Sequence, residues 1–391
     1  MVVESAAALS PAERRSVATL AVIYAVRMLG LFLLLPVLFL HAGSLPGGTP
    51  LLAGLAVGAY GLTQALLQIP FGVWSDRLGR RPLIVAGLLL HIGGSALGYF
   101  ATTAWALVIA RTVQGMGAVS GPVMALLADR TRAASRTRAM AFIGISIGIS
   151  FVASLVAGPL LAGVIGVAGI FALVGGLGIV ALALILFAVP RETARASGQV
   201  RKSWRAVLTR RLLPHYAGIF VLHLALTATF VAIPQALHDV HEIATPRHWE
   251  FYLAVFATSL SLTVPLLLWS ERSARPARTV VAGVLLLAGA QVALALCYLN
   301  FIALAVALVI FFGAFNFLEA RLPASLSRAA GEEARGAALG VFSTCQFGGA
   351  FAGGILGGGL LGSAAGMPGV FLLAGVAAAG WLAVAGRSES P

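Results

Sequence analysis

The chain has 391 residues, of which 60% are apolar or aromatic and only 10% are charged. A water-soluble domain usually carries about 25% charged residues, so this composition excludes a typical soluble protein, and its hydrophobicity excludes intrinsic disorder. The formal net charge of +13 fits either nucleic-acid binding or a membrane topology signal, and the positions of the basic residues distinguish the two.

Twelve apolar runs, bounded by charges or by glycine and proline, follow one another along the chain. About 20 apolar residues in a helix cross a hydrocarbon core of ~30 Å, so these runs predict membrane spans. The first run follows Arg14 and Arg15 and lacks a small-residue cleavage site, which predicts a span rather than a removable signal peptide. The expected spans are 17–41, 51–74, 82–101, 104–127, 138–161, 164–189, 213–237, 249–270, 279–298, 300–322, 335–361 and 366–386.

The connections between these spans alternate in charge. Every second connection contains no lysine or arginine, apart from Arg247 in 238–248. All other basic residues except Arg27 and Arg111 lie on the opposite, arginine-rich side. By the positive-inside rule, we expect that side and both termini to face the cytoplasm, with the spans in the lipid bilayer of the cell (inner) membrane. The positive charge therefore indicates topology, and no nucleic-acid partner is predicted.

The chain divides into two halves that resemble each other. The N-terminal bundle, 1–189, and the C-terminal bundle, 213–391, contain six spans each. Trp-Ser-Asp-Arg at 74–77 reappears as Trp-Ser-Glu-Arg at 269–272. Two parallel six-helix bundles around a central cavity are the architecture of a secondary transporter. The predicted fold is therefore an all-α integral membrane protein with twelve transmembrane helices and a solute site near the midplane.

The connection between the halves, 190–212, is basic. Val200, Trp204, Val207 and Leu208 recur in it at helical spacing. This pattern predicts a basic amphipathic helix on the anionic inner leaflet, with a flexible polybasic tether as the alternative.

The cysteine and lysine residues do not indicate a disulfide, a metal site or a phosphate-binding site. Cys297 and Cys345 lie within apolar runs, so the sequence has no disulfide framework and no metal-binding Cys-x-x-Cys spacing. The only lysine, Lys202, is not preceded by the glycine pattern of a phosphate-binding loop. We expect no metal, no cofactor and no enzyme activity.

The strongest local motif is 72–82, which reads Gly-Val-Trp-Ser-Asp-Arg-Leu-Gly-Arg-Arg-Pro. It closely resembles the G-x-x-x-D-R-x-G-R-R/K signature between the second and third helices of the major facilitator superfamily, and the twelve-span pattern agrees with that resemblance. In the family this cluster is thought to latch the cytoplasmic side shut when the cavity opens outward. The alternative is a basic loop that only fixes topology. The expected gate residues are Gly72, Asp76, Arg77, Gly79, Arg80, Arg81 and Asp129.

The chemistry of these gate residues is consistent with a latch. Gly72 lets two helices approach closely, and Gly79 allows a tight turn. Asp76 can accept backbone N–H groups at the start of a neighbouring helix, where the helix dipole favours an anion. The arginines can pair with acids such as Asp129.

Two further motifs match the superfamily less completely. Residues 111–115, Arg-Thr-Val-Gln-Gly, resemble its R-x-x-Q-G motif, whose arginine is associated with proton coupling; a structural hydrogen-bonding role is the alternative. The segment 158–163 approximates the antiporter motif G-x-x-x-G-P-x-x-G-G through Gly158, Pro159 and Gly163, but Ser154 and Ala162 stand where glycines are expected. An antiporter is therefore supported only in part.

Ionisable residues within membrane spans are costly and usually functional. Glu319 is the only carboxylate well inside a span, and Arg27 and His223 lie at similar depths. The superfamily resemblance places the helices of all three around the cavity, and their flanking strings resemble the YajR-type branch of proton-coupled exporters. We expect Glu319 to exchange protons, with a static Arg27–Glu319 ion pair as the alternative. The expected proton-coupling and cavity residues are Arg27, Arg111, Gln114, His223, Asn316 and Glu319.

These observations predict a secondary active transporter that works by alternating access. The expected activity is proton-coupled efflux of small organic or amphipathic compounds by a monomer. One alternative is a proton symporter or facilitator that imports a metabolite. An alternative of another class is a membrane sensor or lipid-handling protein without solute turnover.

Overall fold

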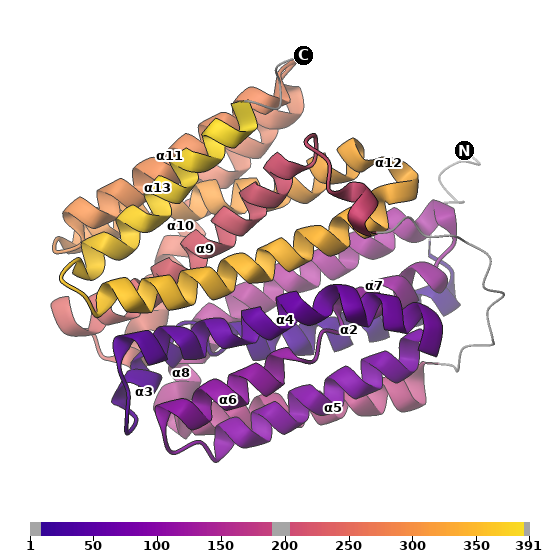
Figure 1. The fold of residues 1–391 in the computed structure, drawn as a ribbon, viewed down its shortest axis with the longest axis horizontal. Helices are drawn as coiled ribbons and strands as arrows, with labels where there is room; N and C mark the ends of the chain where they lie inside the picture. Colours follow the sequence, from indigo (N-terminus) through magenta and orange to yellow (C-terminus); the bar gives the residue numbers. More distant parts are fainter. Residues whose placement is uncertain (1–8, 190–203, 387–391) are drawn as a thin grey trace.

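The computed structural model describes residues 9–189 and 204–386, and this part of the chain is helical with no β-strand (Figure 1). The N-terminal half contains α2 (Pro11–Phe32), α3 (Leu38–Ser44), α4 (Pro50–Leu78), α5 (Arg80–Tyr99), α6 (Ala104–Gly115), α7 (Ser120–Asp129), α8 (Ala133–Ala183) and the π-helical turn η1 (Leu184–Ala188). The C-terminal half contains η2 (Trp204–Val207), α9 (Leu213–Gln235), η3 (Ala236–Val240), η4 (Thr245–Arg247), α10 (His248–Arg272), α11 (Pro276–Cys297), α12 (Phe301–Leu361) and α13 (Gly366–Gly386).

The helices account for the twelve expected spans. Ten stretches of the described residues are long and apolar enough to cross a membrane. One of them, in α8, contains the fifth and sixth spans, which meet at Gly166 with a φ of 70°. The fourth span is missing from the ten because it is divided into α6 and α7. The tenth and eleventh spans, both in α12, meet at Gly331 with a φ of 72°. These positive φ angles suit glycine because other residues rarely adopt them.

Two spans that the sequence predicts as continuous are interrupted. The first ends as α2 at Phe32 and resumes as α3 at Leu38, and Pro36 in the interruption has no N–H for a helical hydrogen bond. The fourth is interrupted at 116–119, where Gly117 lies so close to α5 that an added Cβ would be 2.4 Å from the carbonyl oxygen of Gly87. Tertiary packing at these points outweighs local helical preference.

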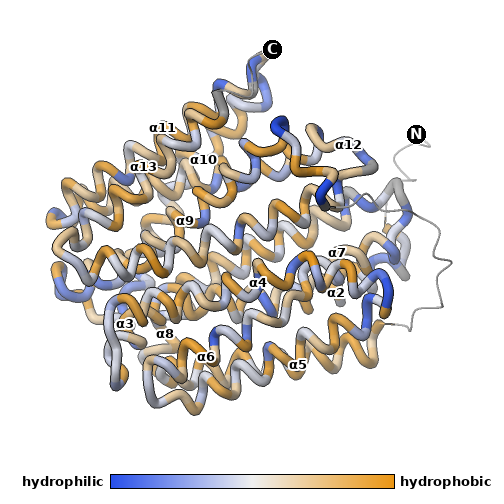
Figure 2. The backbone as a smooth tube through the Cα atoms, in the orientation of Figure 1, coloured by the Kyte–Doolittle hydropathy of each residue, from blue (hydrophilic) through white to orange (hydrophobic). Residues whose placement is uncertain are grey.

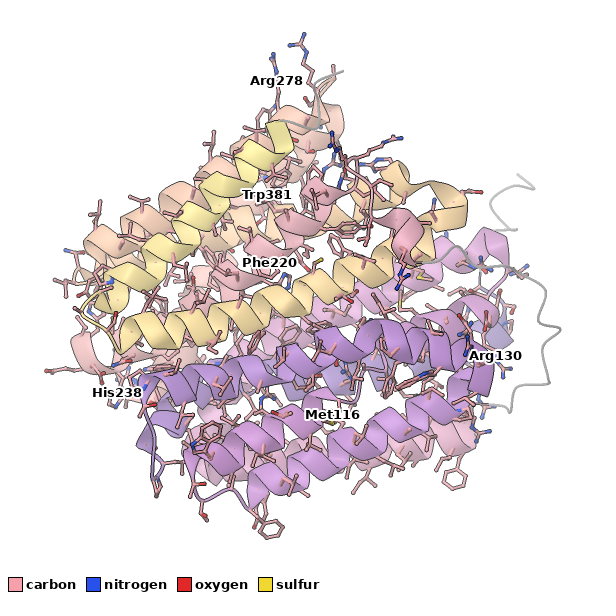
Figure 3. All side chains as sticks on the ribbon, in the orientation of Figure 1. Met116, Arg130, Phe220, His238, Arg278 and Trp381 are labelled. Atoms are coloured by element: carbon pink, nitrogen blue, oxygen red, sulfur yellow. The ribbon has the colours of Figure 1, made fainter. Side chains whose placement is uncertain are left out.

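The two ends of the helical bundle differ in composition, and we name them the arginine-rich and arginine-poor ends. Figure 2 shows strongly hydrophilic residues mainly at these ends and hydrophobic residues along the helices between them. Figure 3 places Arg130 and His238 at opposite ends. Both described chain ends lie at the arginine-rich end, because Glu13 in α2 binds Arg132 and Trp381 in α13 donates to the carbonyl of Pro214 at 3.0 Å.

Glu13 fixes the start of the first span. It forms a capping box with Ser10, whose backbone N–H donates to Oε2 at 2.8 Å. The same carboxylate accepts from the Arg132 guanidinium at 3.0 Å and from the Ser135 hydroxyl at 2.9 Å. The hydrogen bond to this carboxylate, together with its negative charge, raises the pKa of Arg132. One buried acid thus ties α2 to the beginning of α8.

The halves pack against each other at the arginine-poor end. There α4 lies against the second span of α12, and the two helices diverge toward the arginine-rich end (Figure 1). A Cβ on Gly54 would lie 2.2 Å from the carbonyl oxygen of Gly354, and one on Gly358 would lie 2.3 Å from that of Pro50. A second contact sets Gly163 of α8 against Pro246 of η4.

The hydrophobic core reflects the same asymmetry. One cluster of buried residues runs through both halves and includes Ala53 and Ala56 of α4. A second cluster belongs to the N-terminal half alone and includes Leu20 of α2 and Leu126 of α7. The first cluster therefore connects the halves, and the second stabilises the arginine-rich end of one half by itself.

The linker between the halves lies largely outside the described residues, which omit 190–203. In the described part, Trp204–Val207 forms a 3₁₀ turn rather than an α-helix. Val207 is buried and its carbonyl accepts from the Tyr216 hydroxyl at 3.2 Å, whereas Leu208 is exposed. The described part of the linker thus docks onto α9 through Val207. The amphipathic helix that the sequence predicts around Val200 stays a prediction, because Val200 lies outside the described residues.

Candidate functional site

The gate motif forms a compact ionic cluster centred on Arg80. Gly79, with a φ of 96°, ends α4 and begins α5, so the chain reverses without a long loop. Arg80 is 7% exposed and forms an ion pair with Asp76. Its Nε lies 3.6 Å from Asp129 Oδ2, and its Nη1 donates to the Ser75 hydroxyl at 2.7 Å. The cluster therefore joins the ends of α4, α5 and α7.

Two expectations for this motif can be compared with the structure. Asp76 forms an ion pair with the Arg80 guanidinium of its own motif. Gly72, expected at a close helix approach, is approached by α7, since a Cβ on Gly121 would lie 4.0 Å from the Gly72 Cα, but nothing lies within 4 Å of a Cβ added to Gly72 itself. The divergence of α4 and α12 at this end leaves that face open. Of the remaining arginines, Arg77 is exposed and Arg81 donates to the carbonyl oxygen of Leu186.

Arg27 is buried at the interruption of the fourth span. Its side chain is 1% exposed, and its Nε donates to the carbonyl oxygen of Gly117 at 2.8 Å. Its two terminal nitrogens donate to Ser120 at 3.2 Å and to Gln64. The Gly117 carbonyl, between α6 and α7, accepts the backbone N–H of Val119 at 2.8 Å, and the guanidinium adds a second hydrogen bond to it. Arg27 therefore connects α2, α4 and the broken fourth span.

Arg111 forms a second buried polar cluster in the same half. It is 2% exposed and donates to Gln114 Oε1 at 2.5 Å, while Gln114 donates to the Ser95 hydroxyl at 2.9 Å. Arg111 also lies over the Tyr60 ring, 4.7 Å from the centroid, and Arg27 lies 5.8 Å from the same centroid. One aromatic ring thus accepts two cations, which lowers the cost of burying them.

Glu319 and His223 meet in the C-terminal half. Glu319 lies mid-way along a span of α12, and its side chain is 38% exposed. His223 of α9 places Nδ1 3.9 Å from Glu319 Oε2. Gln346, on the other span of α12, places its amide nitrogen 2.8 Å from His223 Nε2 and 3.4 Å from Glu319 Oε1. We name these three residues the C-half polar site.

The structure separates Arg27 from this site. No ion pair joins Arg27 to Glu319 in the described part of the chain, so the static pair considered as an alternative is absent from this conformation. Asn316 lies one turn before Glu319 on α12 and is partly exposed. His223 and Glu319 therefore come together as expected, whereas Arg27 and Arg111 belong to the other half.

The antiporter-like motif occupies packing positions. A Cβ on Gly158 would lie 2.6 Å from the carbonyl oxygen of Leu33, within the interruption of the first span. Pro159 is inside α8, and a Cβ on Gly163 would lie 2.8 Å from Pro246 of the other half. These residues allow α8 to approach both the first span and the C-terminal half.

Several residues of these sites were not selected from the sequence. They are uncharged and polar within apolar helices, namely Tyr60, Gln64, Ser95, Ser120 and Gln346. Polar side chains in a membrane span often form hydrogen bonds between helices, and that signal would have identified them. No cluster of three or more His, Cys, Asp or Glu side chains suited to a metal ion occurs among the residues that the structure describes.

Comparison with known proteins agrees with the architecture. The family model described as "Major Facilitator Superfamily" matches residues 20–268. The chain is 40% identical over 388 residues to the "Inner membrane transport protein YajR" of Escherichia coli (strain K12), covering 98% of this chain and 85% of that protein. It is 29% identical over 271 residues to the "Multidrug resistance protein MdtH" of Photorhabdus laumondii, covering 66% of this chain and 65% of that protein.

Solved structures share the fold at low identity. A bacterial homologue of the human lysosomal transporter Spinster, in an inward-facing and occupied conformation, has a TM-score of 0.75 at 15% identity, covering 97% of each chain. The human organic anion transporter MFSD10 has a TM-score of 0.68 at 17% identity, covering 96% of this chain and all of that one. The matching family model and the extended similarity to YajR establish that this chain is a membrane transporter of the Major Facilitator Superfamily rather than an enzyme.

Proposed function

We propose that this transporter exports small organic or amphipathic compounds across the inner membrane in exchange for protons, with Glu319 as the group that binds and releases the proton. The observation that carries this proposal is the C-half polar site. Glu319 places a carboxyl group in the middle of a membrane span, beside His223 and Gln346, on a side chain that is 38% exposed, and an ionisable group in this position is usually functional.

The surroundings of this site favour an apolar solute. Four phenylalanines precede Glu319 on α12 and are buried within the protein, namely Phe311, Phe312, Phe315 and Phe317, and Phe315 is the one with a ring contact to the site among the described residues. The Phe315 ring centroid lies 5.8 Å from that of His223, edge to face. The similarity to a protein named for multidrug resistance supports efflux as the direction.

The packing of the halves supports alternating access. Gly72 lies eighteen residues after Gly54 on α4, five full turns of an α-helix, so the two glycines share one face. On α12, Gly336 precedes Gly354 by the same interval. Gly54 and Gly354 are packed at the arginine-poor end, whereas added Cβ atoms on Gly72 and Gly336 would have nothing within 4 Å. Rocking the halves would open the first contact and close the second.

The remaining site residues take supporting roles in this proposal. The cluster around Arg80 acts as a cytoplasmic latch, since it lies beside the open face at Gly72. Arg27 and Arg111 act as fixed positive charges, because both are buried and hold internal hydrogen bonds. The arginine-rich end, with both termini, faces the cytoplasm, and the protein works as a monomer.

The experiment that tests this function uses protein reconstituted in vesicles, with ethidium and tetracycline as probe solutes. An imposed pH difference should drive the probes against their gradients, and each probe should move protons in the opposite direction. Glu319→Gln should bind the probes without coupled transport. Glu250→Gln, at a surface acid paired with Arg247, is the matched control and should transport normally.

Two results would contradict the proposal. Glu319→Gln protein that still drives a probe against its gradient by a pH difference removes the proton role of Glu319. Probe accumulation inside vesicles with an acidified exterior, in protein oriented with its arginine-rich end inside, shows import with protons instead of export.

A further inference from the structure

Gln346 contacts both ionisable residues of the C-half polar site. Its amide nitrogen is the atom that faces them, 2.8 Å from His223 Nε2 and 3.4 Å from Glu319 Oε1. His223 belongs to α9, Glu319 to the tenth span and Gln346 to the eleventh, so one amide connects three spans. We propose that Gln346 is a positioning residue that makes proton uptake at His223 and at Glu319 cooperative.

The hydrogen bonds of Gln346 indicate the protonation states of His223 and Glu319 before proton uptake. An amide nitrogen only donates, so His223 Nε2 must accept, and its ring proton is on Nδ1. That Nδ1 lies 3.3 Å from the carbonyl oxygen of Ile219 and 3.9 Å from Glu319 Oε2. The same amide group donates to Glu319 Oε1, which accepts as a carboxylate. With the nitrogen inward, Gln346 therefore favours neutral His223 together with ionised Glu319.

Protonation of either residue weakens the bond from the amide nitrogen. A proton on His223 Nε2 would put two donors face to face, and a proton on Glu319 makes its oxygens weaker acceptors than those of a carboxylate. Rotation of the Gln346 amide by about 180° exchanges its nitrogen for its oxygen, which accepts from such donors. Once the oxygen faces the site, the second proton also finds an acceptor. Uptake of one proton thus assists uptake of the other.

Direct charge attraction between the two residues acts in the opposite sense. A positive His223 favours a negative Glu319, so attraction alone makes the two protons bind in separate steps. The sign of the coupling therefore distinguishes the amide from simple electrostatics. The amide brings the pH midpoints of the two protonation steps closer together, whereas charge attraction alone moves them apart.

No other charged group intrudes on this pair. None of the remaining titratable side chains on α2, α9 and α12 forms a hydrogen bond or ion pair with His223 or Glu319 in the described residues; those nearest in sequence or in depth are Arg27, His215, Tyr216, Arg321 and Cys345. On α4, α10 and α11, charged side chains and histidine are confined to the helix ends: Asp76, Arg77, His248, Glu250, Glu271, Arg272 and Arg278. The other titratable groups on these helices, Tyr60, Tyr252 and Cys297, form no hydrogen bond with His223 or Glu319 among the described residues. The described part of α13 has none.

The position of Gln346 gives the coupling a structural consequence. The next residue, Phe347, has its carbonyl oxygen 2.7 Å from the position of a Cβ on Gly61 of α4. Gly354, two turns further along the same helix, forms the contact between the halves. A change in the hydrogen bonding of Gln346 thus acts on the helix that holds the arginine-poor end closed.

The test measures protonation directly, in the full chain reconstituted in lipid vesicles. Infrared spectroscopy follows the carboxylic acid of Glu319, assigned by its loss in Glu319→Gln, and nitrogen NMR follows His223, assigned by its loss in His223→Phe. Wild-type protein should protonate both residues within one steep transition. Gln346→Met, which keeps the side-chain length without the amide, should separate the two midpoints by about one pH unit or more.

A matched control and a second variant at Gln346 complete the test. Ser343→Ala, three residues earlier on the same helix, should titrate like wild type, and Gln346→Leu replaces the methionine variant if that protein does not fold. An unchanged midpoint separation after loss of the amide overturns the coupling alone. This inference rests on the proposed function in that Glu319 must exchange protons, so a wild-type Glu319 that stays ionised throughout overturns both.

Discussion

Gly54 and Gly354 meet backbone to backbone, since a Cβ on Gly54 would lie 2.2 Å from the carbonyl oxygen of Gly354. Real Cβ atoms do not approach a backbone oxygen so closely, so a single added methyl must push α4 and α12 apart. The contact is closer than those of Gly358 with Pro50 and of Gly163 with Pro246, which also join the two halves. Its response to substitution therefore reports how the halves move.

Gly54→Ala should shift the population toward a conformation that is open at the arginine-poor end. Overpacking of this kind costs about 1–3 kcal/mol, enough to change a two-state ratio by roughly 5- to 150-fold. Spin labels at Ser44 and Ser363, which are exposed at the arginine-poor end of the two halves, should report a longer distance by double electron–electron resonance. Gly93→Ala, where a Cβ has nothing within 4 Å, is the control. An unchanged distance in Gly54→Ala would mean that the contact does not hold the halves together.

Gly72→Leu should have the opposite effect. A side chain at Gly72 meets nothing within 4 Å in the present conformation, but it would block the approach of Gly336 in the alternative one. The same spin labels at the arginine-poor end should show a larger closed fraction, and solute turnover should fall by tenfold or more. Normal turnover in Gly72→Leu would show that α4 and α12 do not close on this face.

Arg27→Lys should destabilise the protein although the charge is retained. Three different nitrogens of Arg27 bond Gly117, Ser120 and Gln64, and an ammonium group cannot reproduce that fork. We expect a loss of about 2–4 kcal/mol, because buried acceptors lose their donors. Thermal unfolding in detergent measures it, with Arg14→Lys as the surface control. Wild-type stability combined with lost solute binding would instead assign Arg27 to the solute.

Arg80→Ala should cost more stability than Arg77→Ala. Arg80 is 7% exposed and pairs with Asp76 and Asp129, whereas Arg77 is exposed. Removing the buried cation leaves two acids without it, which we expect to cost about 1–3 kcal/mol. Parallel thermal unfolding of both variants gives the difference. Equal unfolding temperatures would show that the Arg80 cluster contributes nothing to stability in this conformation.

The positions of the two ends can be tested by labelling. In a background with Cys297 and Cys345 replaced by alanine, Gly47→Cys should react with a membrane-impermeant maleimide on intact cells. Arg136→Cys, exposed at the arginine-rich end, should react only after permeabilisation. Reaction of both cysteines from the same face would contradict the proposed topology.

Much of the fold could be predicted from the sequence. The division of the tenth and eleventh spans, expected between 322 and 335, lies at Gly331, and that of the fifth and sixth, expected near 161–164, lies at Gly166. The interruption at Pro36 had a local signal in the proline itself. The interruption at 116–119 did not, because it depends on the approach of Gly117 to Gly87, thirty residues earlier in the chain.

The candidate site could be predicted from the sequence only in part. The charged members could be identified because a charge inside a membrane span is conspicuous. Their partners could not be identified, because they lie far away in the sequence. Arg27 forms hydrogen bonds with Gly117 and Ser120, and Gln346 donates one to Glu319. Gly72 shows the same limit: its motif predicted a close approach but not its partner, which is Gly121 of α7, while the face of Gly72 where its own Cβ would lie is open.

Hydropathy and charge alone determined that this chain enters a bilayer as twelve helices in two related halves, because the cost of placing each residue in hydrocarbon or in water is a property of that residue. Only the tertiary structure decided that Glu319 faces His223 instead of Arg27, and that the halves meet at Gly54 and Gly354. Such contacts depend on how whole helices pack, and packing joins residues that no local pattern connects.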